Sequence, residues 1–355
     1  MPPTAAGTKP KSAATAAPKR AASPKPSRPG SAATKAAPST KGSSSSAAAK
    51  GTAAKGSIGA YTKLKAVGKG SFGQIWLVKH TTKGGEQVVL KEIHLKKLSP
   101  NEVKAQKLEI EVLKKASHAS IIGFVNTFEV EGIIGLLMEH APAGDLDTAI
   151  KKRIKDGNVK FPESQITQLC VQLAAALNHC HNSLKLIHRD VKPANIFLTD
   201  NGDVKLGDFG LCAYLSEKLS SEPVGTPIYM APEILAGKQQ GGKGADVWAF
   251  GCTLYEAMSL KWPWMQLDDG RGGLEGGMAG LLKCVNTQVL DTESLKVEKG
   301  GNYPTSLCDA TAKLLHREAD KRMQLAKLVE QLEAKPEIPA SWGLSAAAQA
   351  ALNIS

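Results

Sequence analysis

Two polar motifs in the second half of the chain constrain its fold more than any other feature. Residues 188–195 read HRDVKPAN, and residues 208–210 read DFG. In phosphoryl transfer, Asp190 would accept a hydroxyl proton and Lys192 would steady the moving phosphoryl group, while Asn195 and Asp208 would hold magnesium against the phosphates of ATP. Two motifs at a fixed spacing arise by chance far less often than one, so we expect a fold that brings these four side chains to one site.

The first part of the chain has a composition that opposes folding. Residues 1–59 contain eight lysines, two arginines and no acidic residue, so they carry +10 of the net charge of +12. Residues 1–56 also contain eight prolines and almost no large apolar side chains, which prevents long helices and leaves no core to offset the entropy of ordering. We therefore expect a disordered basic arm over residues 1–56 and a fold that begins near Tyr61.

Neither the cysteines nor the apolar stretches indicate a secreted or membrane protein. The six cysteines are Cys170, Cys180, Cys212, Cys252, Cys284 and Cys308, and none belongs to a CxxC pair. Without a secretory signal, reduced thiols in a cytosolic or nuclear protein are expected. Cys180 lies between two histidines, which raises zinc binding, but adjacent side chains diverge and no second ligand pair is evident. Polar residues interrupt the most apolar stretch, 121–138, so no membrane span is expected.

The residues from Tyr61 to Glu139 show the pattern of a small lobe rich in β-sheet. Strands are predicted at residues 64–69, 74–80, 87–93, 123–129 and 133–139. Residues 100–116 carry apolar side chains at helical spacing, and Ser99 fits the N-cap of that helix.

After Gly144 the pattern becomes mostly helical. Helices are predicted at residues 146–155, 163–181, 245–259, 280–285, 306–315 and 325–332, with a short strand at 204–206. Residues 268–277 are rich in glycine and predict a surface insertion. The residues after Lys335 predict a short tail without a clear pattern.

A glycine-rich segment lies between the first two predicted strands. Gly68, Gly70 and Gly73 would let the backbone approach phosphates closely. The pattern alone also fits an ordinary hairpin or a Rossmann turn, but a Rossmann turn requires a helix directly after the last glycine. Residues 74–78 predict a strand instead, which favours a lid over a nucleotide.

Lys91 ends the third predicted strand among apolar residues, so its ammonium group needs a partner. Glu109, on the following helix, can supply one, and the pair would orient the α- and β-phosphates of ATP. The alternative is a surface salt bridge on a helix rich in lysine and glutamate. The neighbouring motifs favour the catalytic pair.

Taken together, these motifs resemble those of the eukaryotic protein kinases. The motifs, in the order of that family, are Gly68-x-Gly70-x-x-Gly73-x-Ile75, Val89-x-Lys91, Glu109, His188 to Asn195, Asp208-Phe209-Gly210 and Ala231-Pro232-Glu233. Lys192 and the segment 225–229 are similar to those of Ser/Thr kinases, and the phrases at 91–93, 144–146, 192–198 and 206–210 are most similar to the NIMA-related (NEK) family. The resemblance covers about residues 61–333.

The resemblance implies an α+β fold of two lobes. Residues 61–140 would form a small sheet-rich lobe with one major helix, residues 141–333 a larger, mostly helical lobe, and residues 334–355 a short C-terminal tail. ATP and Mg²⁺ would be the cofactors.

The resemblance also implies roles in nucleotide binding and in the core. Met138 would be the gatekeeper, while Glu139 and Ala141 would offer backbone groups to adenine. The nucleotide would further contact Val67, Ile75, Val89 and Phe197. A regulatory spine would consist of Leu113, Phe124, His188 and Phe209, with Asp246 as its anchor, and Glu233 would pair with Arg322. Each position also fits an ordinary core residue, whose replacement would destabilise the fold.

The segment after DFG departs from the NEK pattern. Glu222 stands where these kinases usually carry a phosphorylatable residue, and Ser220 and Ser221 precede it. A carboxylate supplies about −1 where a phosphate supplies about −1.5 to −2. We hypothesise that Glu222 faces Arg189 and partly replaces phosphorylation, with a solvated loop glutamate as the equal alternative. Ser220, Ser221 and Thr226 are further candidate regulatory positions.

The basic arm suggests an acidic partner. Tubulin tails, nucleic acid and anionic membrane are candidates, and binding by charge alone would weaken with salt. Phosphorylation at Ser23-Pro24-Lys25 would reduce the charge, and the alternative is a tail without a specific partner. Cytoplasmic, cytoskeletal, centrosomal, basal-body or nuclear localisation is compatible with these expectations.

The sequence thus predicts a Ser/Thr protein kinase that phosphorylates protein substrates, with NEK-like roles in the cell cycle, microtubules or cilia. A pseudokinase or a scaffold whose arm docks on microtubules or nucleic acid is the alternative. Lys91, Asp190 and Asp208, which pseudokinases usually lack, are all present.

Overall fold

The computed structural model describes residues 57–58, 60–70, 73–82, 84–217, 223–238, 242–264 and 276–333. The predicted arm over 1–56, the tail over 334–355, and Ser220, Ser221 and Glu222 lie outside the described residues, as does most of the predicted insertion at 268–277.

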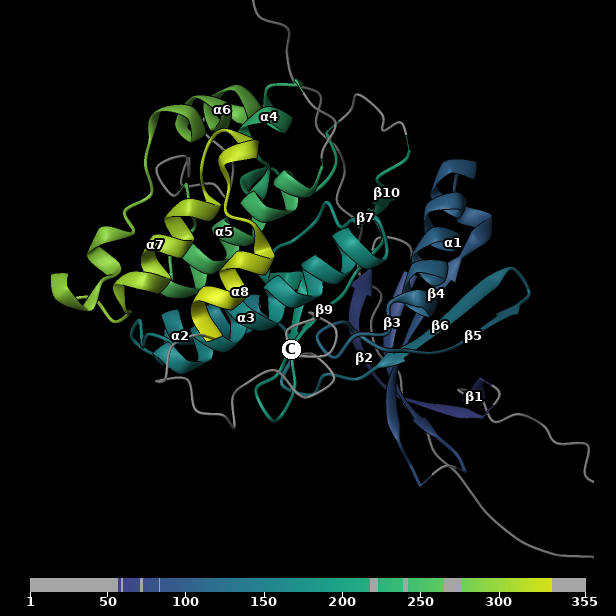
Figure 1. Ribbon diagram of the computed structural model, residues 1–355. Helices are drawn as coiled ribbons and strands as arrows, with labels where there is room; N and C mark the ends of the chain where they lie inside the picture. Colours follow the sequence, from purple (N-terminus) through teal and green to yellow (C-terminus); the bar gives the residue numbers. More distant parts are fainter. Residues whose placement is uncertain are drawn as a thin grey trace, which may run out of the picture. The chain divides into compact units, whose positions relative to one another are not determined.

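The N-terminal lobe is built on one antiparallel sheet with a single long helix (Figure 1). Six strands of the described chain lie in the order β1-β2-β3-β4-β6-β5. Their bounds are β1 Ser57–Ile58, β2 Tyr61–Gly70, β3 Gly73–His80, β4 Gln87–His94, β5 Phe124–Val130 and β6 Ile133–Glu139. Sequential hairpins account for β1 to β4, whereas the helix α1, Pro100–Lys115, separates β4 from β5 in the sequence.

Helix α1 begins where its sequence provides a capping box. Ser99 Oγ accepts a hydrogen bond from the Glu102 N–H at 3.4 Å, and Glu102 Oε2 accepts from the Ser99 N–H at 2.7 Å. Pro100 occupies the first helical position, where a missing N–H costs nothing. Glu109 lies on the buried face of the helix. Because the cap fixes where the helix begins, it also helps to fix the position of that carboxylate.

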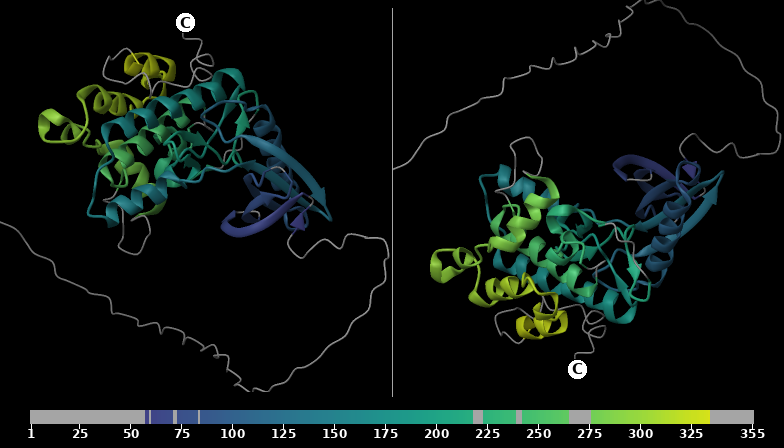
Figure 2. Two further views of the ribbon diagram at one scale, coloured as in Figure 1. Left: turned by 90° about the horizontal axis from the view of Figure 1, so that it is seen from below. Right: turned by 90° about the horizontal axis from the view of Figure 1, so that it is seen from above.

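The C-terminal lobe is mostly helical and has its core around two helices. Its helices are α2 Leu146–Lys155, α3 Glu163–Asn178, α4 Pro232–Leu235, α5 Lys243–Ser259, α6 Gly277–Thr287, α7 Thr305–Leu314 and α8 Leu325–Glu333. Helices α3 and α5 are buried along most of their lengths, as expected for helices that are apolar on several faces. The two views of Figure 2 show the helices gathered on one side and the sheet of the other lobe beside them.

Two short two-stranded sheets and a 3-10 turn, Pro193–Asn195, lie around the polar motifs. The strands are β7 Leu186–Ile187, β8 Ile196–Leu198, β9 Val204–Leu206 and β10 Ala213–Tyr214; β7 pairs with β10, and β8 pairs with β9. The 3-10 turns are Leu95–Lys97, Pro193–Asn195, Pro227–Tyr229, Glu293–Leu295, Val297–Lys299 and Ala319–Lys321. These connections place both polar motifs at the edge of the helical lobe.

The predicted fold class is confirmed, and the elements differ from the predictions mainly at their ends. The α-helix predicted over 163–181 ends at Asn178 and continues as a π-helical turn, His179–Ser183. The strands β1, β7, β8 and β10 and the helix α4 were not predicted, because segments of two to four residues seldom show a hydrophobic period.

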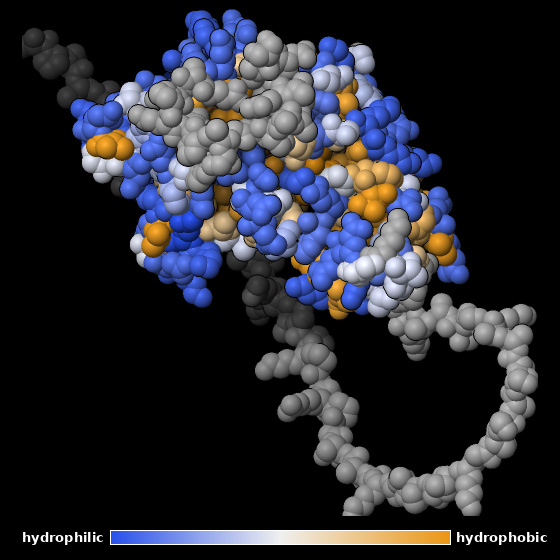
Figure 3. Space-filling view, turned by 60° about the horizontal axis from the view of Figure 1, so that its bottom comes forward, coloured by the Kyte–Doolittle hydropathy of each residue, from blue (hydrophilic) through white to orange (hydrophobic). Residues whose placement is uncertain are grey.

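Among the described residues, eleven large apolar side chains are exposed, from Leu64 in the N-terminal lobe to Val297 in the C-terminal lobe. In the view of Figure 3, hydrophilic side chains predominate and the apolar ones form separate patches. No helix in the described ranges combines the length and the apolar character that a membrane span requires. The six cysteines are free thiols, and five of them are buried.

Candidate active site

The centre of the site is the carboxylate of Asp190, which lies in the loop between β7 and β8. Lys192 Nζ donates to Asp190 Oδ2 at 2.8 Å, and Asn195 Nδ2 donates to the same oxygen at 2.9 Å and to the Asp190 carbonyl at 2.8 Å. Thr226 Oγ1 donates to Asp190 Oδ1 at 3.0 Å and accepts from Lys192 Nζ at 2.7 Å. Three side chains therefore hold both oxygens of one nearly buried carboxylate.

The backbone of this loop is held by Asp246, near the start of α5. Asp246 Oδ2 accepts the N–H of His188 and Oδ1 accepts the N–H of Arg189, both at 2.8 Å. Arg189 has a φ of 68°, in the left-handed region that residues other than glycine seldom adopt. Burial by itself would raise the pKa of the Asp246 carboxyl, but hydrogen bonds and charges from His181 and His188 hold it below its ordinary value. The anchor thus stays ionised and fixes the loop that carries Asp190.

Lys91 on β4 connects α1 with the DFG motif. Its Nζ lies 2.7 Å from Glu109 Oε1 and 2.9 Å from Oε2, and 3.6 Å from Asp208 Oδ1. Burial alone would lower the pKa of Lys91, but the charges of Glu109 and Asp208 raise it above its ordinary value, so the group stays an ammonium. The Asp208 side chain is 49% exposed, which leaves one carboxylate of this trio open to a ligand.

In the glycine-rich hairpin of β2 and β3, packing excludes a Cβ at Gly73 but leaves room for one at Gly68 and Gly70. The register of the hairpin pairs Gly68 with Ile75 and Gly70 with Gly73. A Cβ on Gly73 would lie 1.7 Å from the carbonyl oxygen of Glu92 on β4, so strand packing alone requires glycine there. Val67, predicted to contact the nucleotide, is 46% exposed.

The residues expected around the adenine come from adjacent strands and the segment that follows them. The register pairs Val89 with Met138 across β4 and β6. The N–H of Glu139 donates to the carbonyl of Gly123 at 2.8 Å, so its carbonyl oxygen is the backbone group that it can offer to a base. Ala141 follows at a buried position.

Phe197 lies on β8, directly after the loop of the catalytic residues. Its ring would be 2.8 Å from a Cβ on Gly207, so the residue before Asp208 must be glycine for the two segments to pack. Phe197 therefore packs against the residue directly before the DFG motif.

The predicted spine residues pack between the lobes. The rings of His188 and Phe209 meet edge to face, with centroids 4.8 Å apart, and both side chains are fully buried. Leu113 is buried, and Phe124 packs against the same core. Because Asp246 binds the His188 N–H, the column rests on α5.

Arg189 reaches the start of the segment that follows DFG. Its Nε donates to the Leu211 carbonyl at 2.5 Å, and Nη2 lies 3.4 Å from the Cys212 carbonyl. Burial lowers the pKa of Arg189 from its ordinary value. Its predicted partner, Glu222, lies outside the described residues.

The predicted pair of Glu233 and Arg322 is a two-pronged ion pair between a buried arginine and a largely buried glutamate. Arg322 Nη1 and Nη2 each lie 2.7 Å from a different carboxylate oxygen of Glu233. Further bonds from Arg322 to the carbonyls of His316, Gly244 and Arg317 use its remaining donors. This arrangement ties α4 to the segment before α8.

Three polar groups in the site or next to it in the sequence make contacts, or lie in positions, that were not predicted. Thr226 was predicted as a regulatory position, and the structure places its hydroxyl on Asp190 and Lys192. Gln106, on α1, is fully buried, and its amide nitrogen lies 3.9 Å from a Cβ position on Gly210. Tyr229 donates to Glu256 Oε2 at 2.6 Å, and burial raises the pKa of that glutamate to about 7. Only Thr226 had a sequence signal, in its position between Gly225 and Pro227.

Comparison with known proteins agrees with this geometry. The family model described as the protein kinase domain matches residues 61–332. The chain belongs to the protein kinase family. The predicted family is thereby confirmed, and a protein kinase domain uses ATP, typically with Mg²⁺.

The relatives of this kinase domain are named NEK-type Ser/Thr kinases. Nek1 of Mus musculus is 39% identical over 203 residues, which are 57% of this chain and 16% of that protein. Nek5 of Homo sapiens is 40% identical over 206 residues, or 57% and 28%, and nekl-2 of Caenorhabditis elegans is 36% identical over 208 residues, or 57% and 58%. The kinase domain is thus most like the NEK family, and the match spans less than two thirds of each relative.

Proposed function

We propose that this protein is an active Ser/Thr protein kinase that transfers the γ-phosphate of MgATP to hydroxyl groups of protein substrates. The observation that carries the proposal is the network around Asp190, in which Lys192, Asn195 and Thr226 hold both carboxylate oxygens. A positioned carboxylate of this kind suits general-base chemistry on an incoming hydroxyl. The relatives, all named Ser/Thr kinases, give further support.

The donor set suits a hard divalent cation. Asp208 presents a half-exposed carboxylate, and Asn195 uses its amide nitrogen for Asp190, which leaves its amide oxygen free for a ligand. Oxygen donors of this kind match Mg²⁺. In this proposal Asn195 and Asp208 hold the ion, which neutralises phosphate charge when bound.

In this proposal, each of the polar side chains of the site has its own role in phosphoryl transfer. Asp190 accepts the hydroxyl proton at Oδ1, which receives only the Thr226 hydrogen bond in the described structure. Lys192 stabilises the charge that moves between nucleotide and substrate, while Thr226 keeps both groups aligned. Lys91, fixed by Glu109, orients the α- and β-phosphates.

The ATP pocket in this proposal uses the residues predicted for it. Val67, Gly68, Gly70, Gly73 and Ile75 form the lid, and Val89, Met138, Glu139, Ala141 and Phe197 surround the base. The proposal gives Arg189, Ser220, Ser221 and Glu222 the regulatory role, with Glu222 partly replacing a phosphate.

The basic arm over residues 1–56 suggests a partner and a location for the proposed kinase. Its charge of +10 over residues 1–59 favours an acidic polymer such as tubulin tails or nucleic acid, and a cytoskeletal, centrosomal, basal-body or nuclear site. Co-sedimentation with microtubules, and with DNA, across a salt series tests this part, because binding by charge alone weakens steeply with salt.

A peptide-library phosphorylation assay tests the kinase activity. Asp190→Asn should lower incorporation by about 100-fold or more, because the amide cannot accept the proton. Asp320→Asn, at an exposed position, is the matched control and should keep full activity, and melting curves check that both proteins fold. Equal incorporation by Asp190→Asn and the wild type would remove the enzyme proposal.

A further inference from the structure

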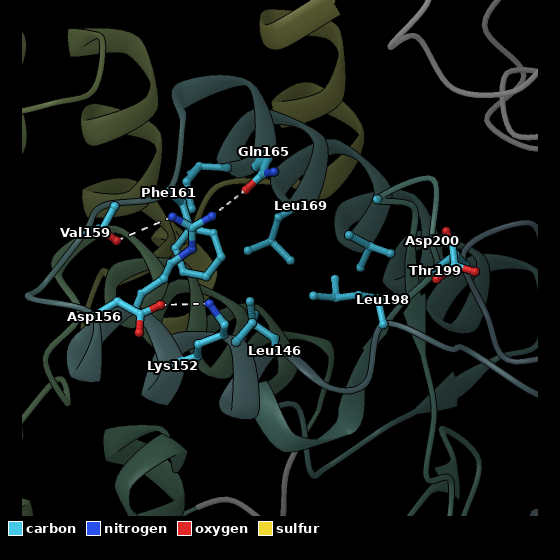
Figure 4. A pocket seen from close by; sticks show the side chains of 16 residues that line it. Leu146, Lys152, Asp156, Val159, Phe161, Gln165, Leu169, Leu198, Thr199 and Asp200 are labelled. Carbon is cyan, nitrogen blue, oxygen red and sulfur yellow. Dashed lines mark hydrogen bonds and ion pairs between the residues drawn. The ribbon is translucent and has the colours of Figure 1, made fainter. Parts of the chain in front are cut away.

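A cavity of about 480 Å³ lies in the C-terminal lobe, formed by residues other than the catalytic ones. Helix α2, helix α3, the loop over 159–161 and the β8–β9 hairpin form its walls. Figure 4 shows Leu146, Leu169 and Leu198 pointing from three of these elements toward its centre. A volume of this size is typical of sites that bind a ligand or a few side chains.

The lining favours an apolar occupant. Phe161, Ile166 and Val204 add to the three leucines. Three charged groups at the rim already have partners: Lys152 Nζ lies 2.7 Å from Asp156 Oδ2, and Arg153 binds protein groups, as described below. These are three of the four charged residues in the lining, and the fourth, Asp200, lies in the β8–β9 turn. An occupant therefore gains mainly by burying apolar surface.

The walls are held open by hydrogen bonds that do not depend on an occupant. The Arg153 guanidinium lies over the Phe161 ring, 3.9 Å from its centroid, and donates to the Lys160 carbonyl at 2.9 Å and to Gln165 Oε1 at 3.1 Å. On the opposite wall, the Leu198 N–H donates to the Gly144 carbonyl at 2.8 Å. The cavity is preformed, which reduces the entropic cost of filling it.

The two ends of the chain differ in their capacity to fill such a cavity. Residues 1–56 contain Met1 and no other large apolar side chain, together with ten positive charges. Residues 334–355 contain two charged side chains, Lys335 and Glu337, and five large apolar ones. These five are Ile338, Trp342, Leu344, Leu352 and Ile354.

The C-terminal segment also starts within reach of the cavity. Helix α8 ends at Glu333 and packs against α3, and α3 supplies Gln165, Ile166 and Leu169 to the cavity wall. Trp342 follows Glu333 by nine residues, or about 30 Å of extended chain. That length is comparable with the span of a small domain, so the segment can cross the face of α3.

We propose that residues 334–355 dock in this cavity of the same chain, with Trp342 and Leu344 as the buried anchors. The linkage makes a weak contact sufficient, because a short tether gives an effective concentration of about 1 mM. A segment that binds with a Kd of about 100 µM as a free peptide would then be docked about nine tenths of the time.

The docked segment would be connected to the proposed ATP site through strand β8. Leu198 lines the cavity, and Phe197, its neighbour on β8, is in the proposed adenine pocket. Docking should therefore change the KM for ATP more than kcat, because it affects the position of Phe197 and not that of Asp190.

A competition between the tethered segment and a free peptide tests the proposal on the full chain. A fluorescent peptide of residues 334–355 is added to the full-length protein and to its Trp342→Ser/Leu344→Ser variant. We expect saturable binding to the variant and at least tenfold weaker binding to the wild type, whose cavity is filled in cis. Equal binding to both would overturn docking in cis and indicate a cavity open to a separate partner, and binding to neither would overturn the site.

Substitutions at the cavity mouth locate the contact. Val159 lines the cavity and is 53% exposed, so Val159→Glu should leave the core intact. Introduced into the Trp342→Ser/Leu344→Ser background, it should weaken peptide binding about tenfold. Val289→Glu, at a position that is 82% exposed and does not line the cavity, is the matched control and should bind as before. Equal effects of the two substitutions would overturn the assignment to this cavity.

Discussion

Two ion pairs in this kinase domain have similar geometry, but only one of them lies next to a charged group that a ligand can reach. Lys91–Glu109 and Arg322–Glu233 both place nitrogen and oxygen 2.7 Å apart; Lys91, Glu109 and Arg322 are buried, and the Glu233 side chain is 14% exposed. Lys91 has a further, looser contact of 3.6 Å to the half-exposed Asp208, whereas Arg322 spends its remaining donors on three backbone carbonyls. The difference teaches that distance alone does not distinguish a functional pair from a structural one. Lys91 can still act on a ligand, because its second neighbour, Asp208, is exposed and only loosely bound to it.

Arg322→Gln should give the largest loss of stability. The substitution leaves the largely buried Glu233 carboxylate without its partner, and removal of one member of a buried pair costs about 3–5 kcal/mol. Urea denaturation measures the change in the free energy of unfolding. The control is Lys321→Gln, whose exposed pair with Glu318 is expected to contribute less than about 1 kcal/mol. A similar small loss for both variants would contradict the structural role of Arg322.

Lys91→Met should chiefly affect activity. Removal of one positioned charge at a site of phosphoryl transfer lowers kcat/KM by about 100- to 1000-fold, or about 3–4 kcal/mol of transition-state stabilisation. Steady-state kinetics on a protein substrate measure it, with Lys79→Met, an exposed lysine on β3, as the control. If Lys91→Met lost only stability, as Arg322→Gln is expected to, the contrast between the two pairs would disappear.

The rings of His118 and His179 lie with their centroids 5.1 Å apart, and this junction should make stability fall at acidic pH. Burial, then the charges of His179 and Lys205, lowers the pKa of His118 to about 4, and burial also lowers the pKa of His179. The unfolded chain protonates His118 near pH 6.5, so it binds more protons than the folded chain between about pH 6.5 and 4, and stability is lost as the pH falls through that window. After allowance for partial exposure, the loss is about 2 kcal/mol.

Denaturation curves at pH 7 and pH 5 of the wild type and His118→Asn measure this slope. Asparagine retains an acceptor for the Ser120 N–H, which donates to His118 Nδ1 at 3.0 Å. The variant should lose part of the pH dependence. An unchanged slope would show that other groups determine the acid sensitivity of this junction.

Gln106→Leu should have the smallest effect of the four, and its direction is stabilising. Gln106 is fully buried, and neither amide atom has a hydrogen-bond partner in the described structure. An apolar side chain of similar size removes that penalty, for a gain of about 1 kcal/mol. Gln172→Leu is the opposite control, because the Gln172 amide binds Asp203 and the Val204 N–H. A loss of stability in both would mean that Gln106 has a partner in the folded protein.

Local sequence accounts for the elements and for the identity of the catalytic groups. Ser99 and Glu102 mark the start of α1 because a capping box needs only neighbouring residues. Helix α2 and strand β6 have the predicted bounds because their apolar residues recur over seven residues or more. Where an element is very short, as in β8, or changes its hydrogen-bond period, as after Asn178, local pattern carries too little information.

By itself, the sequence determined the family, the order of lobes and elements, and the residues able to perform phosphoryl transfer. Only the tertiary structure decided which of them meet: Thr226 with Asp190, Gly73 with the Glu92 carbonyl, and Phe197 with Gly207. It alone also decided that α2, α3 and the β8–β9 hairpin enclose a cavity, and that Gln106 is buried. The physical reason is that residue type and spacing determine local conformation, whereas close packing between distant segments determines which groups touch and which remain free.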